Sequence, residues 1–244
     1  RCGELLKAAP NGWVMEYYVG KDYSLGGITL LCRFDGQRVT MASQMAEADE
    51  TVSSLYSVKS EQATMLSFDT YNYLVHYFGQ PQGSMSDDPN GTLGGDYEFI
   101  ISSASAERIE LKGKKYGNRI VMKALSEDQT WKQYLTKIKK VEDDAFFYEY
   151  DLLMDGLYTG QMLRSNYTFI VTYYDEIGKV HQKTVPFMFT ADGMRFHEPV
   201  TIDGQTMQNF VWKNELISFV CTDEGATGIK LAGVYTAGYQ SYDY

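Results

Sequence analysis

The chain has 244 residues and a formal net charge of −10, and 44% of its residues are hydrophobic and 14% aromatic. This length and apolar content suffice for one large buried core or two small ones. The acidic balance argues against a nucleic-acid partner, which would need a basic face. The sequence also lacks the run of about 18 apolar residues that a transmembrane helix requires.

The first predicted element is a short helix over residues 2–9, which ends before the turn Pro10-Asn11-Gly12. Strand-like runs follow, in which apolar and polar residues alternate with the period of two that is typical of strands. These runs cover residues 13–19, 27–34, 38–45, 51–60 and 64–69. Asp35-Gly36 is expected to form the hairpin turn between the second and third runs.

A less regular segment comes next. Residues 71–78 place apolar side chains at i, i+3, i+4 and i+7, which favours one or two helical turns. Gly, Ser, Asp and Pro then dominate residues 79–95, so we expect a loop there.

Residues 94–125 carry the clearest pattern, three consecutive antiparallel strands separated by turn residues. Together with the earlier runs, they give about eight strands in sequence between Trp13 and Leu125. We expect these strands to curl into a barrel-like or lipocalin-like meander, because closure removes exposed strand edges. The basic residues of this segment are expected on the solvated side of a hairpin: Lys112, Lys114, Lys115, Arg119 and Lys123.

Residues 126–144 are predicted to form one prominent amphipathic helix. Ser126 and Gln129 have capping-box spacing at its start. The expected apolar face consists of Trp131, Tyr134, Leu135, Ile138 and Val141, with lysines on the opposite face.

Strand-like runs return after this helix. They cover residues 146–154, 167–174, 179–189, 193–196, 199–202, 205–212, 216–222 and 228–234. The predicted fold class is therefore mainly β, with antiparallel meanders and one prominent helix. The predicted organisation is an N-terminal β unit (1–125), a connecting helix (126–144) and a C-terminal β unit (145–244).

Large side chains at the apolar steps of these segments are predicted to form the core. They are Trp13, Phe34, Phe99, Ile109, Leu111, Trp131, Phe169 and Phe187. The three cysteines have neither metal-site nor disulfide-framework spacing. Cys32 and Cys221 lie in apolar runs and are expected to be small buried hydrophobes, although a disulfide between them stays open.

Several motifs resemble those of a family of Bacteroidetes lipoproteins of unknown function, domain of unknown function 4302. The residues that carry the resemblance are Ala9-Pro10-Asn11-Gly12-Trp13, Phe68-Asp69-Thr70-Tyr71-Asn72, Gly94-Gly95-Asp96-Tyr97-Glu98-Phe99, Leu111-Lys112-Gly113-Lys114-Lys115, Gly117-Asn118 and Thr190-Ala191-Asp192-Gly193. The resemblance covers most of the chain. It supplies no catalytic residue, because the family has no assigned activity.

The resemblance implies a compartment. Similar proteins are secreted and lipid-anchored in the cell envelope, so we expect localisation at the outer membrane. The sequence starts with Arg1, so we expect the anchoring cysteine in a segment upstream of it. Cys2 lies inside the first predicted helix and is not expected to be the anchor.

Common catalytic and metal motifs are missing from the sequence. The three histidines, His76, His181 and His197, form no H-E-x-x-H pattern, and no G-x-S-x-G elbow or phosphate loop is present. Residues 86–97 resemble a calcium loop, but its first and last ligand positions fail. We therefore expect no catalytic residue of a standard type, no metal site and no cofactor.

Acidic pairs leave one enzymatic alternative open. Asp96 and Glu98 are neighbours on one face of a predicted strand, and Asp69 precedes an aromatic patch. Two carboxylates that face one cleft about 5–10 Å apart could hydrolyse a glycosidic bond. The alternative interpretation is therefore a hydrolase that depends on such carboxylates.

Exposed tyrosines favour a binding function instead. A flat ring with a polar tip suits recognition of sugars or peptides. We predict a ligand site at Tyr71, Tyr73 and Tyr77 with Asp69, beside the loop 79–95. In the pairs Tyr17–Tyr18 and Tyr173–Tyr174, one ring of each is expected to face outward. The predicted function is a non-catalytic envelope module that binds glycans or peptides and works with outer-membrane protein partners.

Overall fold

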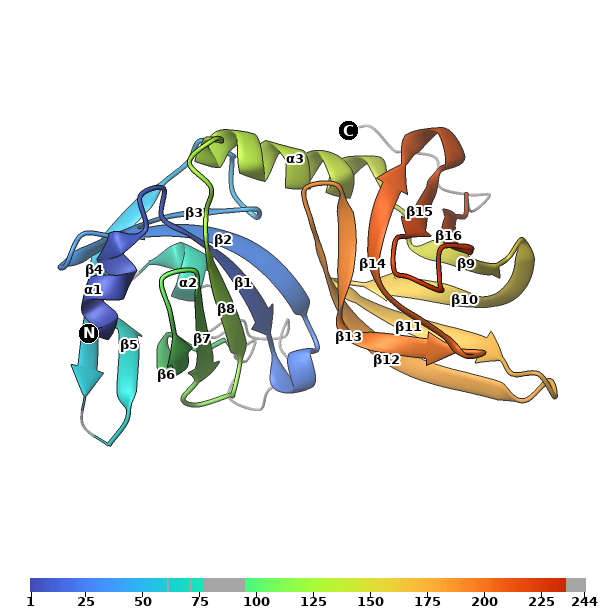
Figure 1. Ribbon diagram of the computed structural model, residues 1–244, viewed down its shortest axis with the longest axis horizontal. Helices are drawn as coiled ribbons and strands as arrows, with labels where there is room; N and C mark the ends of the chain where they lie inside the picture. Colours follow the sequence, from blue (N-terminus) through green and yellow to red (C-terminus); the bar gives the residue numbers. More distant parts are fainter. Residues whose placement is uncertain (61, 71, 77–94, 236–244) are drawn as a thin grey trace, which may run out of the picture. The chain divides into compact units, whose positions relative to one another are not determined.

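The computed structural model describes residues 1–60, 62–70, 72–76 and 95–235, without the side chains of residues 73 and 76. The chain is mainly β, as predicted, and divides into two compact units, residues 1–139 and 140–244. The division falls within the helix α3 (Trp131–Asp144). Each unit contains one closed antiparallel barrel, and we call them barrel 1 and barrel 2 (Figure 1).

Barrel 1 is a meander in which each strand pairs with the next along the chain. Its strands are β1 (Trp13–Val19), β2 (Gly26–Phe34), β3 (Arg38–Ser43), β4 (Val52–Ser60), β5 (Thr64–Phe68), β6 (Glu98–Ala104), β7 (Arg108–Gly113) and β8 (Arg119–Ala124). The barrel closes because β1 pairs with both β2 and β8. The predicted closed meander is confirmed.

Short helical segments accompany these strands: α1 (Cys2–Ala8), η1 (Lys21–Tyr23) and α2 (Tyr73–His76). The predicted Asp35-Gly36 turn is present between β2 and β3. The Asp35 carboxylate accepts hydrogen bonds from the backbone N–H groups of Gln37 (2.8 Å) and Arg38 (2.6 Å). These bonds hold the pKa of Asp35 below its ordinary value, the bond from Arg38 having the largest effect.

Strand alternation directs one row of side chains from each strand into barrel 1. The largest of these side chains are fully buried: Trp13, Met15, Tyr17, Phe68 and Phe99. The Phe99 ring packs edge-on against the rings of Tyr17 and Phe68, with centroids 5.8 Å and 6.1 Å away. Because water does not reach these side chains, the barrel interior at their level is packed core and not a ligand cavity.

The start of α3 corrects the sequence prediction. The helix begins at Trp131 and not at Ser126, and the capping box forms between Thr130 and Gln133. The Thr130 N–H donates to Gln133 Oε1 (2.9 Å), and the Gln133 N–H donates to Thr130 Oγ1 (3.1 Å). Residues 126–130 stay outside the helix, where the Asn11 side chain binds the carbonyl oxygens of Ser126 and Gln129.

The first turns of α3 cover the outer face of β1, β2 and β3. Leu135 is fully buried there against one outward residue of each strand, namely Val14, Leu31 and Ala42. Trp131 packs on this cluster but is only partly buried, so its predicted place in the core is wrong. The other seven predicted core residues are buried, as expected.

Barrel 2 repeats the meander. Its strands are β9 (Glu149–Met154), β10 (Leu157–Ser165), β11 (Thr168–Tyr174), β12 (Val180–Phe189), β13 (Gly193–Ile202), β14 (Gln205–Lys213), β15 (Ser218–Cys221) and β16 (Ile229–Gly233), with η4 (Asn214–Leu216) before β15. It closes because β9 pairs with both β10 and β16.

Two details of barrel 2 differ from the prediction. Strand β10 was not predicted, because Gly160 and a bulge next to Tyr158 interrupt its alternation. The predicted runs 193–196 and 199–202 form one bent strand, β13, whose register shifts between Arg195 and Val200.

The core of barrel 2 is aromatic. Phe169 stacks on Phe187 with ring centroids 4.3 Å apart, and Phe189 meets Phe187 edge-on at 5.3 Å. Cys32 in barrel 1 and Cys221 in barrel 2 are both buried, and both are free thiols. Among the described residues, no helix is long and apolar enough to cross a membrane.

Candidate functional site

Most of the predicted tyrosine site lies outside the described residues. This holds for Tyr71, Tyr77 and loop residues 79–94, and for the side chain of Tyr73, whose backbone begins α2. Asp69 follows β5 with an exposed side chain, and its N–H donates to the Leu55 carbonyl oxygen (3.0 Å). The site therefore stays a prediction.

The chain segment around this predicted site has a structural role. The fully buried Asn72 accepts a hydrogen bond from the Leu74 N–H (3.1 Å) at the start of α2. Its amide nitrogen donates to Ser54 Oγ on β4 (3.1 Å). Thr70 Oγ1 accepts from the Leu55 N–H on the same strand (2.8 Å). Asn72 and Thr70 therefore tie α2 to β4.

Asp96 is a buried structural carboxylate. Its oxygens accept hydrogen bonds from the N–H groups of Lys115 (2.9 Å), Tyr116 (3.0 Å) and Asn118 (3.1 Å), and from the Asn118 side-chain amide (2.5 Å). A Cβ at Gly113 would collide with this carboxylate, so the packing requires glycine. Asp96 therefore holds the β7–β8 turn in place. The sequence motifs that contain Asp96, Gly113 and Asn118 are separated along the chain but are in contact in the structure.

Glu98 belongs to the same region. It lies 3.6 Å from Lys114 Nζ and lines a small cleft of about 110 Å³ with Asp96, Tyr97 and Lys115. Asp69 does not line this cleft. The hydrolase alternative needs two acids that face a substrate, whereas the Asp96 oxygens here bind one turn of the chain. The geometry therefore gives the pair a structural explanation.

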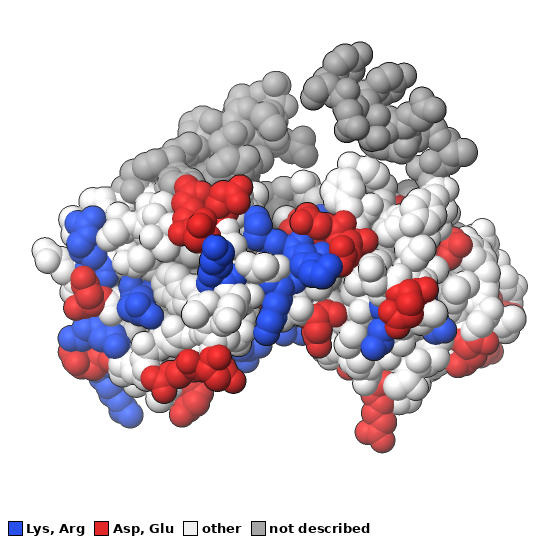
Figure 2. Space-filling view, turned by 90° about the horizontal axis from the view of Figure 1, so that it is seen from above, with Lys and Arg blue, Asp and Glu red and all other residues white. Residues whose placement is uncertain are grey.

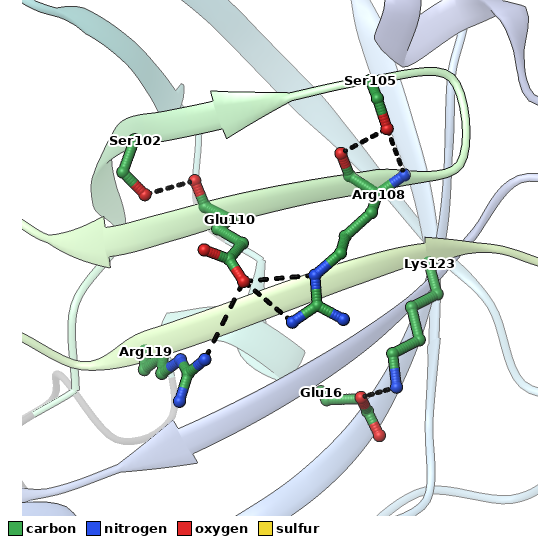
Figure 3. Close-up of polar contacts among 7 residues, drawn as sticks. All are labelled: Glu16, Ser102, Ser105, Arg108, Glu110, Arg119 and Lys123. Carbon is green, nitrogen blue, oxygen red and sulfur yellow. Dashed lines mark hydrogen bonds and ion pairs between the residues drawn. The ribbon is translucent and has the colours of Figure 1, made fainter.

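The basic residues of β7 and β8 lie on the outer face of barrel 1, where acidic residues pair with them. Glu110 Oε1 accepts from Arg108 Nη2 (2.8 Å) and lies 3.9 Å from Arg119 Nη2 (Figure 3). Lys123 Nζ lies 2.7 Å from Glu16 Oε1. The bond from Arg108 lowers the pKa of Glu110. These residues form the solvated polar face that was expected of a hairpin.

The charges on the larger surface are mixed as well. Figure 2 shows Lys and Arg side chains beside Asp and Glu side chains on the face that it presents. A uniformly basic field, which nucleic-acid binding would need, does not cover that face.

His181 and His197 are the two histidines whose side chains the structure describes, and each has an acidic neighbour of its own. His181 Nε2 lies 2.9 Å from Asp175 Oδ2, and its ring stacks on Tyr173 with centroids 5.1 Å apart. The bond from His181 lowers the pKa of Asp175. His197 lies elsewhere on β13, 3.6 Å from Glu198. Over the part of the chain that the structure describes, no group of three or more His, Cys, Asp or Glu could hold a metal ion.

The prediction that one ring of each tyrosine pair faces outward holds for one pair and fails for the other. Tyr174 is 48% exposed and Tyr173 is buried, as predicted for one pair. Tyr17 and Tyr18 are both buried, so the prediction is wrong for the other pair. The Tyr17 hydroxyl donates to the Asp96 carbonyl oxygen (3.1 Å) and accepts from the Asp96 N–H (3.0 Å), and burial raises its pKa.

The segment Asn11-Gly12-Trp13 joins α1, β1 and α3. Trp13 Nε1 donates to the Leu6 carbonyl oxygen of α1 (2.9 Å), and Trp131 Nε1 of α3 donates to the Asn11 carbonyl oxygen (2.9 Å). Gly12 has a φ of 72°, and a Cβ there would collide with the Cys32 carbonyl oxygen. This segment fixes the indole of Trp131 at the surface.

An open hollow of about 590 Å³ lies beside this indole, and we call it the Trp131 hollow. Its lining residues are Asn11, Arg33, Glu127, Asp128, Gln129, Thr130, Trp131 and Gln133. The Arg33 guanidinium carbon lies 5.3 Å from the Trp131 ring centroid, and Arg33 Nη2 donates to Asn11 Oδ1 (3.4 Å). No carboxylate of the described residues forms an ion pair with Arg33.

Sequence analysis missed the Trp131 hollow. Its residues come from the α1–β1 turn, from β2, from residues 127–130 between β8 and α3, and from the first turn of α3, and only the fold brings them together. Chemically, the hollow combines an aromatic ring, a guanidinium group, amides, a hydroxyl and two carboxylates. These groups can donate and accept hydrogen bonds around a polar ligand.

A protein-family model matches residues 1–214, and that family is described as a domain of unknown function, DUF4302. No curated protein and no solved structure matches the chain. The matched range includes all of barrel 1 and the strands of barrel 2 up to β14.

Proposed function

Since the chain belongs to the DUF4302 family of unknown function, we propose that it is a non-catalytic module that binds glycans at the cell envelope. The observation that carries this proposal is the Trp131 hollow. It is concave and lined mainly by planar polar side chains, in contrast to the packed interior of barrel 1.

The chemistry of the hollow favours a glycan over an apolar ligand. Arg33 covers one face of the Trp131 ring, so the guanidinium plane and its N–H groups take part in the lining. Asp128 and Glu127 offer acceptors, and Gln129 and Gln133 offer amides that both donate and accept. Such groups match the hydroxyls of a sugar, each of which also donates and accepts.

The envelope setting rests on the resemblance to lipid-anchored proteins, and the anchor is proposed to lie upstream of this sequence. Metabolic labelling of the full gene product with an alkyne-palmitate probe, followed by membrane fractionation, tests this part. A labelled protein in the outer-membrane fraction is expected. An unlabelled protein found outside the envelope fractions would overturn the setting but not the glycan site.

The binding site is tested on a glycan array, followed by titration of the hits. The variant Arg33→Met/Asp128→Asn removes a donor group and a charged acceptor from the hollow. Each lost hydrogen bond is worth about 0.5–1.5 kcal/mol, so affinity should fall by about tenfold or more. The matched control is Arg119→Met, which removes an arginine from the outer face of barrel 1, away from the hollow.

Three outcomes would count against the proposal. If Tyr71→Ala/Tyr77→Ala abolishes binding and Arg33→Met/Asp128→Asn does not, the ligand site is the tyrosine patch predicted from the sequence. If a bound glycan is cleaved, and Asp96→Asn or Glu98→Gln stops cleavage, the protein is a hydrolase. Equal binding by the parent and the Arg33→Met/Asp128→Asn variant would remove the hollow from the site.

A further inference from the structure

Exposed apolar side chains concentrate on the strands β9–β12 of barrel 2 and on the segments next to them. Nine of the 14 large hydrophobic residues that are exposed in the described part of the chain lie between residues 146 and 180. They are Phe146, Tyr148, Leu157, Tyr158, Leu163, Ile170, Tyr174, Ile177 and Val180. Exposed apolar side chains that gather on one side of a sheet are typical of an interaction surface. Here a polar row separates the apolar residues near the two ends of the strands, and it consists of Asp151, Gln161, Thr172 and Gln182.

The strand register places the central members of this group on one surface. Leu163 on β10 pairs directly with Ile170 on β11, and Tyr174 on β11 pairs with Val180 on β12. Tyr158 on β10 pairs with Leu153 on β9. Residues that pair directly point to the same side of the sheet. We call this surface the outer face of β9–β12.

In barrel 1, a helix covers the strands that correspond to this surface. The first three strands of barrel 1 correspond to β9–β11, because in each barrel the first strand pairs with the second and the last. There α3 lies on the outer face, with Leu135 buried against the strands. Lysines border the contact: Lys139 Nζ donates to the carbonyl oxygens of Gln44 (3.2 Å) and Ala46 (2.9 Å), and Lys132 lies 3.9 Å from Asp49.

The outer face of β9–β12 has no such cover among the described residues. Tyr158 is 57% exposed and Ile170 38%. Two acidic residues lie on this face, since Glu149 pairs with Leu163, and Asp151 with Gln161. No described Lys or Arg forms an ion pair with either carboxylate.

The carboxylates of this face lie close to the Tyr158 hydroxyl. The pKa of Tyr158 is raised by partial burial first, and then by Asp151, Tyr174 and Glu149, so these groups lie close together. A second copy of the chain would bring the same carboxylates to the contact, where like charges repel. A basic partner would meet complementary charge instead.

From this arrangement we propose that the outer face of β9–β12 docks an amphipathic helix of a partner protein, with lysine or arginine residues beside its apolar stripe. The helix would cover barrel 2 as α3 covers barrel 1. The inference does not rest on the glycan site, which lies in the other unit.

The probe for this surface is a fluorescent Leu/Lys peptide of about 18 residues, which is about five helical turns. A Leu/Glu peptide with the same apolar stripe is the matched control probe. Fluorescence anisotropy should show binding of the Leu/Lys peptide, weakened by added salt. The Leu/Glu peptide should not bind, because Glu149 and Asp151 repel it.

Three variants locate the contact. Ile170→Lys should weaken binding of the Leu/Lys peptide by about tenfold or more, since it puts a like charge into the apolar surface. Glu149→Gln/Asp151→Asn should reduce both the affinity and its salt dependence. Leu216→Lys changes an exposed leucine on η4 and should leave binding unchanged. Melting curves of all variants confirm that each is folded.

Several results would overturn the proposal. Equal binding of the Leu/Lys peptide by the parent and Ile170→Lys would remove the site, as would equal binding of the Leu/Lys and Leu/Glu peptides. Sedimentation that shows a dimer of the parent, lost in Ile170→Lys, would make the face a self-contact. Glycan binding lost in Ile170→Lys, but retained in Arg33→Met/Asp128→Asn, would make it a carbohydrate surface.

Discussion

The two barrels attach their first strand to the preceding helix in the same way. In barrel 1, the first large inward side chain is Trp13, whose Nε1 donates to the Leu6 carbonyl oxygen of α1. In barrel 2, it is Tyr150, whose hydroxyl donates to the Ala145 carbonyl oxygen just after α3 (2.5 Å). Both polar atoms are buried, so each bond satisfies a group that water does not reach.

The barrels differ at one inward position of their second strand. This position comes two residues after the residue that pairs with the aromatic side chain of the first strand. Cys32 lies opposite Trp13, and Phe34 follows inside barrel 1, where its ring meets Tyr56 at 4.8 Å. Met162 lies opposite Tyr150, and the corresponding inward residue of barrel 2 is Arg164. One barrel therefore has an aromatic ring where the other has a cation.

Barrel 2 accommodates the Arg164 guanidinium group because the groups around it replace its contacts with water. The Arg164 guanidinium carbon lies 5.1 Å from the Phe189 ring centroid and 5.3 Å from that of Tyr167. Its Nε donates to the Asn166 carbonyl oxygen (2.8 Å), and Nη2 lies 3.5 Å from Glu142 Oε1. An inward strand position can therefore hold a charge when rings, a carbonyl and a carboxylate surround it.

The largest expected effect comes from removing this cation. Arg164→Ala should destabilise barrel 2 by about 3–5 kcal/mol, because Glu142 loses its charged partner and the rings lose packing. Phe34→Ala should cost barrel 1 about the same, for loss of packing alone. Hydrogen exchange read separately on peptides from each barrel measures both effects. If both barrels lose protection in either variant, the two barrels are not independent folding units.

The second-largest destabilisation is expected in barrel 1 alone. Asp96→Asn should cost about 1.5–3 kcal/mol, because hydrogen bonds from three N–H groups to a charged acceptor are weakened. The loss of exchange protection should appear in β6–β8, and barrel 2 should be unchanged. Unaltered protection of residues 113–118 would show that Asp96 does not hold the turn.

A smaller effect tests the shared attachment to the helix. Tyr150→Phe removes one buried hydrogen bond and should destabilise barrel 2 by about 0.5–1.5 kcal/mol. The cost arises because the Ala145 carbonyl oxygen loses the bond from the Tyr150 hydroxyl, while it keeps the bond from the Phe147 N–H (3.0 Å) and the ring packing persists. Denaturant unfolding measures the change. A stability equal to that of the parent would mean that ring packing alone joins the helix to the barrel.

The smallest effect depends on pH. Burial tends to raise the pKa of Asp223, but hydrogen bonds from Asn209 and Gln208 outweigh it, so the pKa lies below 3.8. Asp223 therefore stabilises barrel 2 above the ordinary aspartate pKa, and this contribution is lost as pH falls through the lowered value. Asp223→Asn should be less stable than the parent at neutral pH and similar to it in acid. A constant difference across that range would contradict the assignment.

Sequence patterns predicted the fold better than the details at element ends. Barrel 1 was predictable because its turn residues, such as Asp35-Gly36, separate runs with clear alternation. The start of α3 was not, because Ser126–Gln129 and Thr130–Gln133 both have capping spacing and only the Asn11 contacts distinguish them. Strand β10 was missed because pairing with two neighbours stabilises a segment with weak alternation.

Neither the Trp131 hollow nor the outer face of β9–β12 could be predicted, because both depend on contacts between elements that lie apart in the sequence. Trp131 fits the apolar period of its helix, which predicts burial, and its partial exposure follows from where the turn at Asn11 holds it. Ile170 is likewise one of several apolar residues in its strand. Whether such a residue faces solvent depends on which neighbour covers it.

The contacts of Asn11 also bear on the order of folding during synthesis. Its side chain binds the carbonyl oxygens of Ser126 and Gln129, 115 and 118 positions later. These contacts therefore cannot form until residue 129 has left the ribosome, and the packing of Leu135 on β1–β3 must follow them. None of these contacts requires barrel 2, whose own closure waits for β16 to pair with β9. The first barrel can thus finish folding while the second is still being synthesised.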